Sequence, residues 1–296
     1  MCKKTLVYLT ICTLLIAGLP LIVSANPAPT DVNVPVTAVE PVGANGSIDW
    51  DKGTVEAVGF GIPSSLSRSP AQAKLMARRV AITEARRNLL EAIRGVKIDA
   101  ETTVQNLEIA NDTAKIKISG MVNSAKIINE QQLADGTYQV TMGIKLFGQG
   151  GLSEVITNTT KPATLVPLPE PSSDYKAIDL PAYTGLIIDA AGLPLSRVMS
   201  PVIYDDTGRL IYSQPNLIPE YIISQGMLEY LCTSEDLKAI ELGQSRAGVN
   251  PILVKAVDLR DHNVNIIINQ ASADRILAAN AQAGFLPKTM VCVKQN

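Results

Sequence analysis

The sequence predicts two α+β domains joined by a proline-rich linker. Two hydrophobic regions each mix the alternating pattern of strands with the periodicity of helices, and stretches rich in proline flank the first of them. Of the 296 residues, 46% are hydrophobic and 18% are charged, which is enough apolar material for a folded core. The predicted segments are a signal peptide at 1–25, a disordered tail at 26–46, a first domain at 47–148, a linker at 149–182 and a second domain at 183–296.

Composition excludes several classes of function. The single histidine, His262, rules out a multi-histidine metal site. Aromatic residues make up 4% of the chain, which argues against a stacking platform for sugars or single-stranded nucleic acid. A formal net charge of −2 argues against a dedicated nucleic-acid-binding protein.

The N-terminus predicts export. Two lysines precede an apolar run from Leu6 to Val23, and the small residues of Val23-Ser24-Ala25 suit cleavage before Asn26. The protein is therefore expected in the periplasm or cell envelope. Two alternatives are an uncleaved anchor and a lipoprotein modified at Cys12, although the bulky Ile11 stands where lipoprotein processing requires a small residue.

Cysteine usage predicts one disulfide. Cys2 and Cys12 leave with the signal peptide, so Cys232 and Cys292 remain in the exported chain. An even pair in an oxidising compartment indicates a Cys232–Cys292 bridge. The alternative is a pair of buried thiols.

The first domain is predicted to open with a strand and a long helix. Alternation over Thr54–Gly61 is typical of a strand. Ser69 as N-cap and Pro70 at the first position then begin a helix that runs to about Arg94 and ends at Gly95. A helical stripe expected to face the core comprises Leu75, Ile82, Leu89 and Ile93, widened by Ala71, Ala85 and Leu90.

Two further strands complete a β-α-β-β unit. They are predicted over Ala114–Ile128 and Thr137–Phe147, with the turn signal Ala134-Asp135-Gly136 between them. The unit is therefore a sheet with one long helix on a face.

The second domain is predicted as a mixed α+β layer. Its expected strands are 185–190, 201–204, 209–212, 252–258, 264–269 and 289–294. Its expected helices are 219–231, a continuation to about 246 after a cap at 233–235, and one from 272–274 to 283–284.

No motif predicts a catalytic, cofactor or metal site. Gly59-Phe60-Gly61 lacks the third glycine of a dinucleotide fingerprint, so we interpret it as a strand end where two backbones approach closely. Asp205-Asp206-Thr207-Gly208 lacks the later acid of a calcium loop and indicates a polar hairpin turn. His262 is expected in a solvated turn, and Asp189 ends a buried strand with no identified partner.

One helix carries an excess of positive charge. Residues 43–150 contain 13 basic and 11 acidic residues, whereas 151–296 contain 11 and 15. One interpretation is a patch that binds an anionic envelope partner, formed by Arg79, Arg86 and Arg87. The other is that long arginine side chains pack their stems over the sheet edge.

Several motifs between residues 53 and 147 carry a family resemblance. They are Val58-Gly59-Phe60-Gly61, the alanine-rich Ala77-Arg78-Arg79-Val80-Ala81, Gly120-Met121-Val122 and Asp135-Gly136-Thr137-Tyr138-Gln139-Val140. This pattern resembles the outer-membrane lipoprotein family LPP-twenty and the N-terminal domain of the flagellar assembly protein FlgT. The resemblance implies an exported, non-enzymatic envelope protein, in some relatives tied to the flagellar basal body. It assigns no site residue.

The sequence therefore predicts a non-catalytic envelope protein with a structural or assembly role. Its expected partners are envelope or flagellar proteins, with peripheral outer-membrane association, and no nucleic acid or cofactor. One alternative is a periplasmic module that binds a glycan or peptide through the second domain, and another is a hydrolase of unfamiliar type. Convergent titratable groups in a cleft of 183–296 would favour these alternatives, whereas an exposed apolar patch or sheet edge would favour the first function.

Overall fold

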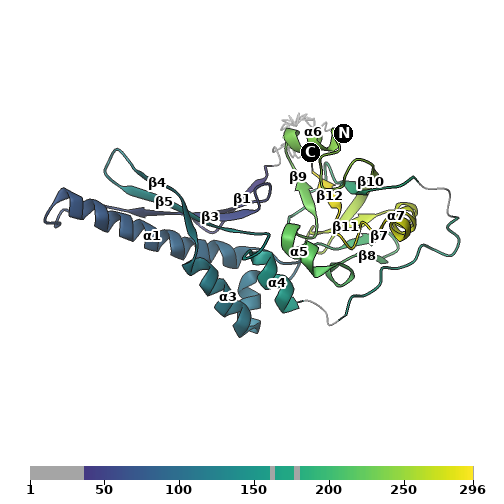
Figure 1. Ribbon diagram of the computed structural model, residues 1–296, viewed down its shortest axis with the longest axis horizontal. Helices are drawn as coiled ribbons and strands as arrows, with labels where there is room; N and C mark the ends of the chain where they lie inside the picture. Colours follow the sequence, from purple (N-terminus) through teal and green to yellow (C-terminus); the bar gives the residue numbers. More distant parts are fainter. Residues whose placement is uncertain (1–36, 161–163, 177–180, 296) are drawn as a thin grey trace, which may run out of the picture. The chain divides into compact units, whose positions relative to one another are not determined.

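A computed structural model describes residues 37–160, 164–176 and 181–295. These residues form two α+β parts, an antiparallel sheet with one long helix and a mixed sheet with its own helices (Figure 1). The predicted fold class is thus confirmed. The predicted signal peptide at 1–25 and the tail up to residue 36 lie outside the described residues.

The first sheet has five antiparallel strands in the order β1-β2-β3-β5-β4. The strands are β1 (Val39–Val42), β2 (Gly46–Asp49), β3 (Thr54–Gly61), β4 (Lys126–Gln132) and β5 (Tyr138–Lys145). The expected β-α-β-β unit is present as β3, the long helix, β4 and β5. The hairpin of β1 and β2 extends the sheet, so part of the stretch expected as a disordered tail is a strand.

Helix α1 (Pro70–Gly95) packs closely on β3, because two glycines of β3 leave room for the helix backbone. The Ser69 hydroxyl accepts a hydrogen bond from the Gln72 amide, which confirms the predicted cap. A Cβ added at Gly59 would lie 2.3 Å from the Ala81 carbonyl oxygen, and one at Gly61 would lie 1.9 Å from that of Ala77. The interpretation of this pair as a site of close backbone approach is therefore confirmed.

The predicted core stripe of α1 is wrong at its N-terminal end. Leu75 is 61% exposed and Ile82 is partly buried, whereas Leu89 and Ile93 are fully buried. The face that packs on the sheet is formed mainly by small residues: Ala77, Ala81, Ala85, Asn88 and Ala92. Large side chains do not fit where the helix backbone rests directly on the glycines of β3.

The predicted strand over Ala114–Ile128 is also wrong. This segment forms helix α3 (Asp112–Asn123), and β4 begins at Lys126. The Asn111 side chain caps α3 by accepting a hydrogen bond from the Ala114 amide. A short helix, α2 (Val104–Ala110), precedes it.

The second sheet has seven strands in the order β8-β7-β11-β10-β6-β12-β9. Its strands are β6 (Gly185–Asp189), β7 (Ile203–Asp205), β8 (Leu210–Tyr212), β9 (Glu229–Leu231), β10 (Pro251–Arg260), β11 (Asn265–Ile268) and β12 (Val291–Lys294). The main helices are α5 (Pro219–Gln225), α6 (Ser234–Glu241) and α7 (Gln270–Ala283). Strands β10, β6, β12 and β9 are parallel, while β10–β11 and β7–β8 are antiparallel.

The predicted helix over Pro219–Leu231 ends early. Gly226 adopts φ 80°, a left-handed conformation that terminates α5, and Glu229–Leu231 then pair with β12 as β9. Helix α7 begins one turn before its predicted cap, because Asn269 rather than Ser272 accepts the capping hydrogen bond.

Part of the predicted linker is structured. Helix α4 (Leu152–Thr160) lies within it and buries Leu152, Val155 and Ile156. Further along, the Asn216 side chain donates to the carbonyl oxygens of Val166 and Pro167 at 3.1 and 3.3 Å. The division into two separately folding domains stays a prediction.

Candidate docking surface

Among the described residues, His262, Cys232 and Cys292 do not form a catalytic arrangement. His262 is 71% exposed in the β10–β11 turn, as predicted, and its ring lies 3.6 Å from the exposed Glu101 carboxylate. Cys232 and Cys292 are both buried. Burial raises the pKa of each thiol, so neither has the thiolate character of a nucleophile. Within the described residues there is no group of three or more potential metal ligands.

The predicted Cys232–Cys292 disulfide is wrong. Cys292 in β12 pairs with Glu229 in β9, so Cys232 stands three positions further along the paired strands. Three strand residues span about 10 Å, beyond the reach of a disulfide. An odd separation also places the two side chains on opposite faces of the sheet, and Cys292 packs with Ile187 and Leu231 in a cluster separate from that of Cys232.

A buried cation joins the two parts at a point that the sequence analysis missed. The Arg197 guanidinium, with its side chain 3% exposed, donates to Glu40 Oε1 at 2.9 Å and Gln295 Oε1 at 2.7 Å. Its Nη2 lies 3.0 Å from Cys232 Sγ. Arg197, Gln295 and Cys232 are buried, and Glu40 is partly exposed at 37%. All four side chains are engaged with one another, so the cluster is structural, and no local sequence pattern marks it.

The smaller candidates are also accounted for by structure. Asp205 Oδ1 accepts hydrogen bonds from the amides of Thr207 and Arg209, which confirms the polar turn. Asp189 caps its own turn through the Ala191 amide and lies 3.7 Å from the Lys294 ammonium.

The outward side of α1 is an exposed surface with both apolar and cationic side chains. We define this outer face by Leu75, Met76, Arg79, Val80, Thr83, Arg86 and Arg87. At 100° per residue, all seven lie within about 80° of the line opposite the buried Ala81. All are exposed, including Met76 at 47% and Val80 at 54%. The three arginines predicted as an anionic-partner patch therefore share one surface.

The alternative interpretation, in which a long arginine side chain packs over the sheet edge, applies to another residue, Arg78. Arg78 reaches across the edge of the sheet, where its Nε donates to Glu130 of β4 at 2.8 Å. Within the described part of the chain, Arg79 and Arg86 form no ion pair. Arg87 makes a single contact with Glu84, at 3.9 Å.

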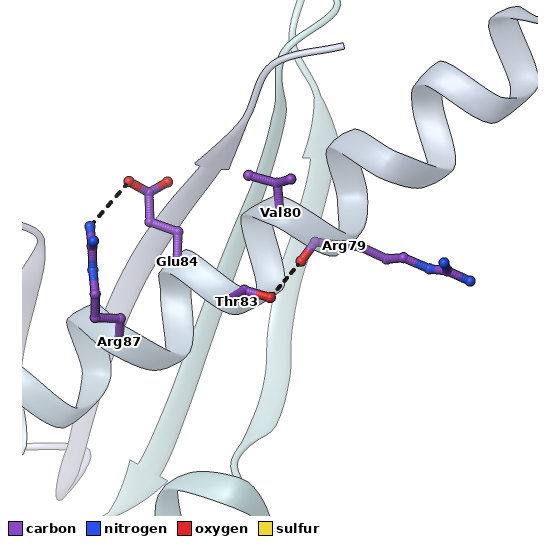
Figure 2. Close-up of a pocket in the computed structure, with 5 residues that line it drawn as sticks. All are labelled: Arg79, Val80, Thr83, Glu84 and Arg87. Carbon is purple, nitrogen blue, oxygen red and sulfur yellow. Dashed lines mark hydrogen bonds and ion pairs between the residues drawn. The ribbon is translucent and has the colours of Figure 1, made fainter. Parts of the chain in front are cut away.

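A pocket of 430 Å³ is lined by Arg79, Val80, Thr83, Glu84 and Arg87. Figure 2 shows that these side chains rise from successive turns of α1 and that Arg79 extends away from Arg87. Glu84 accepts a hydrogen bond from the Phe60 amide at the end of β3, at 2.5 Å. The one carboxylate in the pocket is thus hydrogen-bonded to the sheet, and the guanidinium groups of the two arginines supply the positive charge.

These observations define an α+β protein whose most distinctive accessible surface is one cationic and apolar helix face. Residues 185–294, from β6 to β12, match the family model described as Treponema pallidum Tp0624, second domain. No curated protein matches the chain significantly. The resemblance of residues 53–147 to LPP-twenty and FlgT stays a prediction. None of the helices in the described ranges has the length and apolarity that a membrane crossing requires.

Proposed function

We propose that this is a non-catalytic, exported envelope protein with a structural or assembly role, which binds an anionic partner through the outer face of α1. The observation that carries the proposal is the exposure of Met76 and Val80 beside Arg79 and Arg86. Exposed aliphatic side chains within a charged surface are typical of interaction sites. An exposed apolar patch favours this function over a ligand-binding cleft.

Site-specific photo-crosslinking in the envelope tests this proposal. A crosslinker placed at Val80 should give a discrete adduct, identifiable by mass spectrometry, that decreases when Arg79 and Arg86 are both replaced by glutamate. The matched control is a crosslinker at Leu253, another exposed aliphatic residue, on the second sheet. An adduct that forms equally from both positions, or that survives the charge reversal, would contradict the proposal.

A second candidate function is supported by strand β10. Leu253 and Val257 are exposed on one face of this interior strand, at 63% and 49%. Lys255 is exposed between them, and this aliphatic and basic face without an aromatic ring suits a peptide better than a glycan. Under this alternative, the Leu253 crosslinker would capture the ligand and the Val80 crosslinker would not.

A further inference from the structure

The N-terminal end of α1 continues the outer face into an exposed apolar and basic surface. We call this the basic–apolar end. It comprises Leu66 and Arg68 in the connection before α1, Leu75, Met76 and Arg79 on the outer face, and Lys74, which is exposed on the opposite side of the same helical turn. Leu66 and Ile62 both lie in the connection from β3 to α1 and are 91% and 78% exposed. Single exposed aliphatic residues are ordinary on protein surfaces, but several in one short stretch indicate a surface that is covered in use.

The charge of this surface is one-sided. No Asp or Glu occurs between Ile62 and Thr83. Arg78 within this stretch is paired with Glu130, so the cations available to a partner are Arg68, Lys74 and Arg79.

Two acidic residues border the surface. Asp135 lies in the β4–β5 turn, whose Gly136 approaches Pro63, and it accepts a hydrogen bond from the Thr137 amide. Glu84 follows the stretch and is bound to the Phe60 amide. Three cations against these two engaged carboxylates leave the end positively charged, which favours an anionic partner.

We propose that the basic–apolar end docks on the surface of an anionic phospholipid bilayer. This inference rests on the proposed function, because it names the partner class of the same helix face. Leucine and methionine side chains can enter the boundary of the acyl chains while arginine and lysine contact lipid phosphates, the arrangement that holds amphipathic segments at an interface. A bilayer accepts such a surface without the matched pocket that a protein partner would have to provide.

Vesicle flotation with the exported protein, freed of its signal segment, tests the proposal. The protein should float with vesicles that contain phosphatidylglycerol and remain behind with pure phosphatidylcholine. Each cationic side chain near such a surface contributes about fivefold in affinity. Lys74→Gln with Arg79→Gln should therefore weaken binding by roughly 25-fold, and added salt should weaken the binding of the unaltered protein.

The apolar contribution has its own variant and control. Leu66→Ser with Leu75→Gln should also weaken flotation, whereas Lys238→Gln with Leu242→Gln, at exposed positions in and just after α6, should leave it unchanged. Thermal unfolding checks that each variant is folded. Equal binding of the unaltered protein and the Lys74/Arg79 variant overturns the proposal, as does displacement by free glycerol phosphate, which would indicate a soluble phosphate ligand.

The two proposals fail in different ways. If flotation is absent while the Val80 crosslinker captures a protein in an Arg79-dependent manner, the partner is an acidic protein. The membrane inference is then wrong and the proposed function stands. If both flotation and crosslinking are absent, both proposals are wrong.

Discussion

Two glycines determine how closely the long helix approaches the first sheet. At Gly61, a Cβ would lie 1.9 Å from the Ala77 carbonyl oxygen, and this atom cannot move without displacing the helix. The pattern Gly59-Phe60-Gly61 indicates this close approach correctly, whereas the periodicity of α1 predicts a core of leucine and isoleucine. A pattern of large residues predicts burial only where the partner surface leaves room for them, and here β3 leaves room for alanine.

Replacing Gly61 with alanine should destabilise the protein. The added methyl group forces α1 away from β3, and overpacking of this kind costs about 1–3 kcal/mol. Gly120→Ala is the matched control, because nothing lies within 4 Å of a Cβ at that position in helix α3. There alanine should stabilise by about 0.5–1 kcal/mol. Urea unfolding measures both variants, and equal stability of the two would contradict the proposed contact.

The number of cysteines and the compartment do not by themselves determine whether two cysteines form a disulfide. Composition and compartment made Cys232 and Cys292 reasonable partners, but a disulfide also depends on strand register. Register is a non-local property that follows from β9, and β9 itself had been predicted as the end of a helix. The error in secondary structure and the error in the disulfide therefore have one origin.

Secondary structure was predictable where one pattern was strong and ambiguous where two patterns overlapped. In α3, the alternation of Ala114, Ile116 and Ile118 imitates a strand, yet the residues actually buried are Ala114, Ile118 and Val122. Spacing of four residues is helical, and Asn111 as N-cap supports it. Ile116 is 72% exposed, so the apparent alternation was produced by a surface residue.

The turn between β7 and β8 should make stability sensitive to acid. Burial opposes ionisation of Asp205, but hydrogen bonds from Thr207 and Arg209 outweigh it and hold the pKa of this carboxyl below its usual 3.8. Arg209 also bridges to Asp274 at 2.6 Å, and Asp274 binds the Ser172 amide. Because the folded pKa is lowered, the stabilisation is present above pH 3.8 and is lost as pH falls through the folded value.

Asp205→Asn tests this assignment. At pH 7 the variant should be less stable by about 1–3 kcal/mol, since hydrogen bonds to a charged acceptor are lost. As the pH falls below 3.8 the unaltered protein loses the same contribution, so the difference should shrink. Unfolding curves measured across this pH range test the prediction. If the stability difference between the two proteins does not change with pH, the effect of the substitution is due to packing.

At the scale of the whole molecule, the two α+β parts make direct contacts. The Met199 and Ser200 amides donate to the Lys97 and Ile98 carbonyl oxygens at 3.0 and 2.7 Å. Trp50 packs edge-on against Tyr230, with ring centroids 5.4 Å apart. The sequence predicted the two fold units, but contacts between residues more than 100 positions apart leave no local pattern.

These contacts lead to a prediction about a cleaved chain. Limited proteolysis within the proline-rich segment should cut between Thr160 and Pro181 rather than in the buried helix α4. If the contacts of Trp50 and Arg197 hold the parts together, the two fragments should elute as one species on gel filtration.

Leaving Arg197 buried without its Glu40 partner would be costly, so Glu40→Ala should promote separation of the fragments. Arg87→Ala is the control, because its contact with Glu84 is long and solvent-exposed. Fragments that separate without any substitution would instead support two independent domains, as the sequence alone predicts.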